Sequence, residues 1–141
     1  MWGGAFKTLI NELVVLQKRA IRITTKSNYL SHTNTLFKEL NILKLEDINM
    51  HCCCVFMFKF TYKELPNACS HSLVLYNASH SAYNLRRISE FIIPTFRTSV
   101  REKCISIRGP RYWESLPPNL RSAPTSNSFN VKLRKFILCN Y

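Results

Sequence analysis

Glycine is scarce in this sequence, and its scarcity excludes several ways of binding a ligand. Among the 141 residues only Gly3, Gly4 and Gly109 are glycines. Walker-type phosphate loops and dinucleotide-binding turns need several clustered glycines, so that the backbone can approach the phosphates closely. Collagen-like and low-complexity chains are excluded by composition as well. Whatever this protein binds, we expect no glycine-rich cradle.

Acidic residues are also few, with 8 Asp and Glu against 20 Lys and Arg. The only Asp is Asp47, and Glu46-Asp47 is the only adjacent pair of carboxylates. This pair opens an expected helix, where negative charge suits the positive end of the helix dipole. Polynucleotide synthesis needs paired carboxylates that hold two divalent metals. The sequence therefore contains no pair of carboxylates that we expect to hold two metal ions.

The six cysteines and four histidines form no recognisable metal or nucleophile motif. Cys52, Cys53 and Cys54 are consecutive, so on a helix they point in different directions and cannot converge on one ion. Cys69-Ser70-His71 with His80 is the nearest approach to a zinc pattern, but the partner cysteines are missing. We expect no metal, no cofactor, no small-molecule substrate and no enzyme activity of the chain's own.

Long hydrophobic runs are absent. The longest uncharged apolar run, Cys52–Phe58, is far shorter than the roughly 20 residues that span a bilayer. Lys7 and Glu12 interrupt the first apolar stretch, which is unlike a secretory signal. The scattered cysteines do not resemble a disulfide framework. These features predict an intracellular protein, in the cytoplasm or the nucleus, with no membrane partner.

Positive charge is what the sequence has in excess, with a formal net charge of +12. Residues 1–70 carry 9 basic and 5 acidic side chains, and residues 71–141 carry 11 and 3. A soluble surface usually mixes both signs and holds a net charge of about 2–8 in magnitude. The larger excess favours a polyanionic partner, RNA or DNA.

The first part of the chain has the periodicity of helices. Leu9, Leu13, Leu16, Ala20 and Ile23 alternate steps of four and three, which predicts a helix ending near residues 24–27. A short helix is expected over Thr35–Leu40 and a third over Leu45–Leu65, closed by Pro66. The expected buried stripe of the third helix is Ile48, Cys52, Val55, Phe58, Tyr62 and Leu65.

The texture changes after Pro66. Residues 67–84 are rich in Ser, Asn, Ala and His, which indicates a polar linker. Beyond it, Ser89–Ile93 and Lys103–Ile107 favour two short strands of a hairpin joined by Pro94–Glu102. Gly109-Pro110 is expected to break the chain, and Arg111–Leu116 to form one helical turn.

A last helix is expected to begin at an N-cap, Ser126 or Ser128, and to run to Leu138. The predicted fold is thus mainly α. A three-helix module over residues 1–66 is followed by the 67–84 linker. A small basic module over residues 85–141 carries a short hairpin and the terminal helix.

Two groups of basic residues are the candidate nucleic-acid contacts. They are Lys18, Arg19, Arg22 and Lys26 on the first helix, and Arg86, Arg97, Arg101, Lys103, Arg108 and Arg111 in the basic module. Guanidinium groups bind phosphates bidentately. Aromatic residues lie among the second group and could stack on unpaired bases, although Phe91 and Trp113 fit a small core better. The charged row on the first helix is equally consistent with a solvated helix face.

An ordered set of motifs resembles one family over essentially the whole chain. The motifs are Leu16–Ile23, His32-Thr33, Leu36–Leu45, Tyr83-Asn84-x-Arg86, Pro94-x-x-Arg97-Thr98, Arg108-Gly109-Pro110-x-x-Trp113-x-Ser115-Leu116-Pro117 and Ser128-Phe129-x-x-Lys132-Leu133-Arg134. This set is similar to the C-terminal end of reverse transcriptases from non-LTR (LINE-type, jockey-like) retrotransposons. Leu85 and Cys52–Cys54 depart from the usual pattern, as in a degenerate copy.

The resemblance implies a thumb-like helical region and a C-terminal module that lack the upstream polymerase domain with its Asp-Asp motif. We then expect a truncated fragment of an RNA-directed DNA polymerase, catalytically inert by itself, with residual non-specific binding to a template–primer backbone. In that family the thumb helices track this backbone, which would give Lys18, Arg19, Arg22 and Lys26 phosphate contacts. The alternative is a small basic helical interaction or structural protein with no nucleic-acid role.

Overall fold

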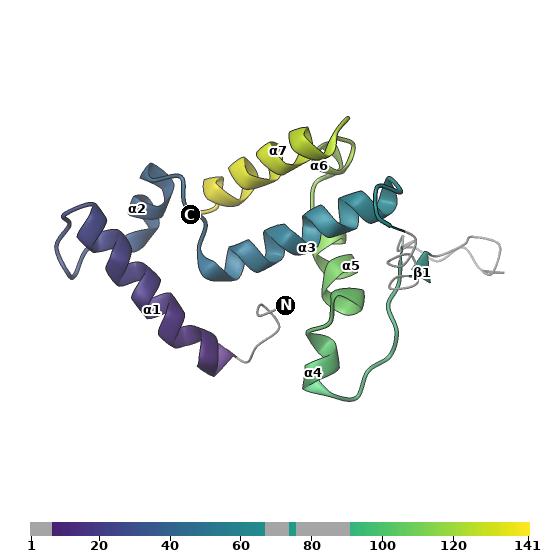
Figure 1. The fold of residues 1–141 in the computed structure, drawn as a ribbon, viewed down its shortest axis with the longest axis horizontal. Coiled ribbons are helices and arrows are strands. Elements are labelled where there is room, and N and C mark those ends of the chain that lie inside the picture. The colour runs from purple at the N-terminus through teal and green to yellow at the C-terminus, as the bar shows by residue number, and fades with distance from the viewer. Residues whose placement is uncertain (1–6, 67–73, 76–90) are drawn as a thin grey trace. The chain divides into compact units, whose positions relative to one another are not determined.

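The computed structural model describes residues 7–66, 74–75 and 91–141, and over these residues the chain is mainly helical, as the sequence predicts (Figure 1). The helices are α1 (Lys7–Thr24), α2 (Thr33–Glu39), α3 (Leu45–Thr61), α4 (Ser99–Glu102), α5 (Ile105–Ser115), α6 (Pro118–Arg121) and α7 (Ser126–Cys139). Two short strands, β1 (Val74–Leu75) and β2 (Phe91–Ile92), pair antiparallel.

The chain divides into two compact units whose boundaries differ from those expected at residues 66 and 84. The first unit comprises residues 1–52 and 123–141, and the second comprises residues 53–122. The C-terminal helix α7 belongs to the first unit because it packs against α2. The boundary falls inside α3, so this one helix contributes to both units. Of the expected linker, residues 67–73 and 76–84 lie outside the described residues.

The first unit has its core between α1 and α2, which lie side by side (Figure 1). Ile21, Leu36 and Phe37 are buried there, with Leu40 packed against them. On α7 the buried residues are Phe129, Leu133, Ile137 and Leu138. The N-cap of α7 is Thr125, one residue before the predicted Ser126, because the Thr125 hydroxyl accepts the hydrogen bond from the Ser128 N–H at 3.2 Å.

The connection between α2 and α3 is held by side chains from two other helices. Gln17 of α1 donates its amide N–H to the carbonyl of Leu43 and accepts from the N–H of Leu45, both at 3.0 Å. Arg134 of α7 donates to the carbonyl of Asn41. The Leu45 N–H is one of the first amides of α3, which have no partner within the helix. Gln17 therefore caps α3 from outside it.

Tyr141 holds the same connection from the end of the chain. Its hydroxyl accepts from the Lys44 N–H at 2.8 Å and donates to the Asp47 carboxylate at 2.6 Å. Its ring packs edge-on against Phe37 and lies under the Lys44 ammonium, 4.0 Å from the ring centroid. Burial and the bond to Asp47 raise the pKa of this phenol well above its ordinary value, so it remains the donor.

The second unit has its core between the second half of α3 and α5. Met57, Phe58, Ile107 and Trp113 are buried, with the rings of Phe58 and Trp113 in an edge-on arrangement. In α3 the buried residues are Cys53, Cys54, Met57 and Phe58, so the predicted stripe is correct only at Phe58. Apolar residues occupy all sides of this stretch of α3, and such a helix has no single face that the spacing could identify.

Two predictions for the basic module are wrong. The expected hairpin does not form, because β2 pairs with β1 while Lys103–Ile107 spans the end of α4 and the start of α5. Helix α5 also continues through Gly109-Pro110. A residue before proline normally avoids helical geometry because its Cβ meets the proline ring, and Gly109 has no Cβ. Burial of Ile107, Gly109, Pro110 and Trp113 along α5 then favours the helix over a strand.

Removing the Tyr141 hydroxyl should destabilise the first unit. Tyr141→Phe keeps the ring contacts but leaves the Lys44 N–H and the Asp47 carboxylate without this partner. We expect the free energy of unfolding to fall by about 1–3 kcal/mol in urea titrations. Tyr29→Phe is the matched control, because Tyr29 is exposed, and it should change stability by less than about 0.5 kcal/mol. Equal effects of the two variants would contradict this role for Tyr141.

Adding a methyl group at Gly109 should also be destabilising. A Cβ there would lie 2.7 Å from the sulfur of Met57 and 3.3 Å from its Cγ. In an open helix, Gly→Ala stabilises by about 0.5–1 kcal/mol, but overpacking of a core costs about 1–3 kcal/mol. We expect Gly109→Ala to lower stability by about 1–2 kcal/mol. In the Met57→Ala background the same change should be neutral or stabilising, and a cost that persists there would exclude the Met57 contact as its cause.

Candidate nucleic-acid interface

The basic group on α1 is not a continuous row of available charges. Lys18 is half-buried and Arg19 is exposed. Arg22 is already bound within its own unit: its Nε donates to the Ser31 carbonyl at 3.2 Å, and its guanidinium lies over the Tyr29 ring, 5.7 Å from the centroid. Arg22 thus fixes the connection between α1 and α2. These contacts give Arg22 a structural role and leave its guanidinium less available for phosphate.

Lys26 lies beyond the end of α1 and does not share a helix face with Lys18 and Arg22, which corrects its expected place on the first helix. Helix α1 ends at Thr24, and Lys26 has a φ of 51°, in the left-handed region. Its N–H bonds the Ile23 carbonyl, and the next N–H, from Ser27, bonds the Arg22 carbonyl. This is the Schellman ending of a helix, which usually places glycine at the left-handed position. In this glycine-poor chain a lysine occupies it instead.

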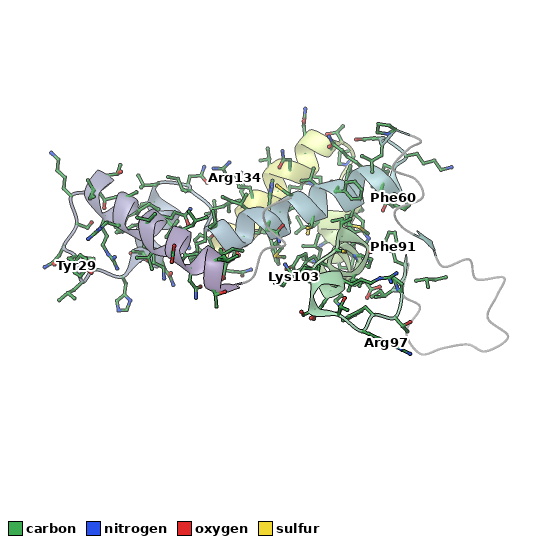
Figure 2. All side chains as sticks on the ribbon, turned by 60° about the horizontal axis from the view of Figure 1, so that its bottom comes forward. Tyr29, Phe60, Phe91, Arg97, Lys103 and Arg134 are labelled. Atoms are coloured by element: carbon green, nitrogen blue, oxygen red, sulfur yellow. The ribbon has the colours of Figure 1, made fainter. Side chains whose placement is uncertain are left out.

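In the second basic group, Arg97 and Arg101 lie together. Both are exposed and line one groove of about 460 Å³, together with Thr95, Phe96 and Thr98. The Thr98 hydroxyl accepts from the Arg101 N–H at 3.3 Å and caps α4, which orders the groove wall. Arg97 lies on the loop that precedes α4 (Figure 2). The groove thus combines two guanidinium groups, two hydroxyls and one aromatic ring.

The remaining basic residues of this group are less available. Arg111 forms a half-exposed ion pair with Glu102, at 3.5 Å, and its guanidinium lies 5.5 Å from the centroid of the Phe96 ring. Lys103 and Arg108 are partly buried and engaged in interactions within the chain. Arg86 lies outside the described residues. Arg111 therefore supports the groove through Phe96, and Arg97 and Arg101 are the described arginines of this group that line the groove.

The aromatic residues divide between core and surface. Phe91 and Trp113 are buried, which confirms their expected place in a core, and Phe91 packs against Phe60 (Figure 2). Phe96 is the partly exposed ring that lines the groove. Its underside is covered by Arg111, so only part of its face is available for stacking. Among the described aromatic residues of this group, Phe96 is the one that lines the groove.

Groups with catalytic potential are buried or separate in the part of the chain that the structure describes. Burial and the neighbouring Cys53 raise the pKa of the Cys54 thiol to about 12, so it stays protonated and is a poor nucleophile. Burial lowers the pKa of His51, which bonds Asn130 of α7. Across residues 7–66, 74–75 and 91–141, no three His, Cys, Asp or Glu side chains are grouped to hold a metal ion. None of the described helices is long and apolar enough to cross a membrane.

No protein-family model, curated protein or solved structure matches this chain. The candidate interface therefore rests on its own geometry and on the motifs in the sequence.

Relief of the left-handed lysines should stabilise the protein. Lys63 ends α3 as Lys26 ends α1, with a φ of 57° and the same pair of backbone hydrogen bonds. A residue with a Cβ is strained by about 1–2 kcal/mol in this conformation. Glycine avoids this strain, but part of the gain is lost because glycine loses more chain entropy on folding. We expect Lys26→Gly and Lys63→Gly each to raise the free energy of unfolding by about 0.5–1 kcal/mol.

Lys38→Gly is the matched control for these two variants, because Lys38 is exposed inside α2. It removes the same charge from a right-handed helical position and should lower stability by about 1 kcal/mol. Urea or thermal unfolding measures all three variants. The same sign of change for Lys26→Gly and Lys38→Gly would contradict the strain assigned to Lys26.

Proposed function

We propose that this chain is a thumb and C-terminal region of the non-LTR retrotransposon reverse-transcriptase type that binds the backbone of RNA or DNA without sequence preference. The observation that carries the proposal is the groove in which Arg97 and Arg101 lie beside Thr95, Phe96 and Thr98. Arg97 and Thr98 also belong to the Pro94-x-x-Arg97-Thr98 motif on which the resemblance partly rests. Groove and motif thus point to the same short segment.

The chemistry of the groove suits a phosphodiester. Guanidinium groups form charge-assisted, bidentate hydrogen bonds with phosphate oxygens, and hydroxyls add neutral ones. Such contacts give affinity and position but no reading of sequence. The net charge of +12 supplies a wider attraction for any polyanion.

By itself the chain is not proposed to synthesise DNA. A polymerase holds two metals between paired carboxylates. The single aspartate, Asp47, accepts a hydrogen bond from the Tyr141 hydroxyl at the start of α3. The proposed role is therefore to grip a template–primer for a catalytic domain that this sequence does not contain.

The test is the salt dependence of binding to a fluorescently labelled RNA–DNA primer–template. We expect Arg97→Gln with Arg101→Gln to weaken binding about tenfold near 0.15 M salt and to reduce the slope of log K against log salt by about 2. Lys132→Gln with Lys135→Gln is the control, because both lysines are exposed on α7 and the change in charge is identical. The control variant should keep most of the affinity.

Three results would contradict the proposal. Equal losses of affinity in the two double variants would mean that only the net charge, and not the groove, contributes to binding. An absence of binding at 50 mM salt, where phosphate contacts still hold, would instead favour a basic helical interaction protein. Extension of the primer by the isolated chain with Mg²⁺ and nucleotides would contradict the absence of catalysis.

A further inference from the structure

Helix α1 has two apolar faces, and only one of them is used by its own unit. Ile21 is buried against α2, and Gln17 bonds the α2–α3 connection. The other face carries the apolar residues whose spacing predicts the helix, and the structure leaves it exposed. The α1 stripe consists of Leu9, 67 % exposed, Leu13, 51 %, Leu16, 56 %, Ile23, 71 %, and the exposed Ala20.

The spacing of the α1 stripe is that of a coiled-coil seam. Single exposed leucines are ordinary on a soluble protein. Here the steps are four, three, four and three without interruption, which are the a and d positions of successive heptads. The 18 residues of α1 extend over about 27 Å. A seam of this kind fits another helix that carries the same pattern.

The charges beside the stripe identify the partner helix and its direction. Glu12 and Arg19 both directly precede a positions, Leu13 and Ala20, so they flank the stripe on one side as g residues. In an antiparallel pair of identical helices, g residues face g residues. Glu12 then lies opposite Arg19 of the second copy, and the pair occurs twice by symmetry.

A parallel pair is less suited to this helix. There, g residues face e residues, which are Ile10, Gln17 and Thr24. None of them is charged, so a parallel pair would leave Glu12 and Arg19 without an oppositely charged partner across the seam.

We propose that α1 is a self-association surface that binds α1 of a second copy of this chain in antiparallel orientation. In this register Leu13 lies opposite Leu16 of the other copy, and Leu9 lies opposite its Ala20. The helix is already held by α2 and by the Gln17 contacts. Association therefore carries no cost of forming the helix, a cost that makes isolated helices of this length marginal.

The experiment is analytical ultracentrifugation of the full chain over a range of protein concentrations. A reducing agent prevents disulfide cross-links, nuclease treatment removes bridging nucleic acid, and 0.3 M salt screens repulsion between the copies. We expect a monomer–dimer equilibrium. Leu13→Glu with Leu16→Glu should weaken the dimer about a hundredfold, because it places charges in the middle of the seam.

Val15→Glu is the matched control. Val15 is also exposed on α1, at 64 %, but lies outside the stripe, and its change should leave the dimer unaltered. Circular dichroism checks that each variant retains its helices. A monomer at every concentration, or a dimer that tolerates Leu13→Glu with Leu16→Glu, would overturn the proposal.

The orientation has its own test. Glu12→Arg and Arg19→Glu should each weaken the dimer about fivefold, since each turns two attractive pairs into repulsive ones. The double variant restores opposite charges and should recover the affinity. A failure of this recovery would overturn the antiparallel arrangement, and binding to some other protein without self-association would overturn the choice of occupant.

Discussion

The connection from α2 to α3, over residues 41–45, is hydrogen-bonded to three side chains that are distant in the sequence. Gln17 donates to the Leu43 carbonyl and accepts from the Leu45 N–H, Arg134 donates to the Asn41 carbonyl, and the Tyr141 hydroxyl accepts from the Lys44 N–H. The first amide N–H groups of a helix have no hydrogen-bond partner within the helix, and a buried N–H that lacks any partner lowers stability. The start of α3 is therefore stabilised by α1, by α7 and by Tyr141. Because of these bonds, the first unit combines residues 1–52 with residues 123–141.

This constraint gives a physical meaning to motifs that a sequence alone would assign to binding. Gln17 and Arg22 belong to Leu16–Ile23, and Arg134 ends the last motif, yet all three bond backbone carbonyls of the first unit. Gly109 and Trp113 of a further motif are buried in the second unit. These five residues of the motif set thus hold the scaffold together. Arg97 is a motif residue that remains exposed, and it lines the groove beside Arg101.

The sequence predicted α1, α2, α3 and α7 well, because helix periodicity and capping are local properties. It could not predict which apolar face of α1 is covered, since both faces have helical spacing and burial depends on distant segments. The predicted break at Gly109-Pro110 is wrong because the effect of a proline on a helix depends on the residue before it. Gly109 has no Cβ, so it removes the clash that usually ends a helix before proline. The sequence also predicts Lys26 on the first helix, because the residue that ends a helix in the left-handed conformation is usually a glycine and this chain has almost none.

Self-association and nucleic-acid binding use different side chains of α1, with one exception. The stripe from Leu9 to Ile23 lies on one face, whereas Lys18 lies on another and Arg22 is occupied by Ser31 and Tyr29. Arg19 is the exception, because it flanks the stripe and is also a candidate phosphate contact. In a dimer its partner would be Glu12 of the second copy. Phosphate binding by Arg19 and self-association therefore compete for one side chain, while the groove of Arg97 and Arg101 is independent of that competition.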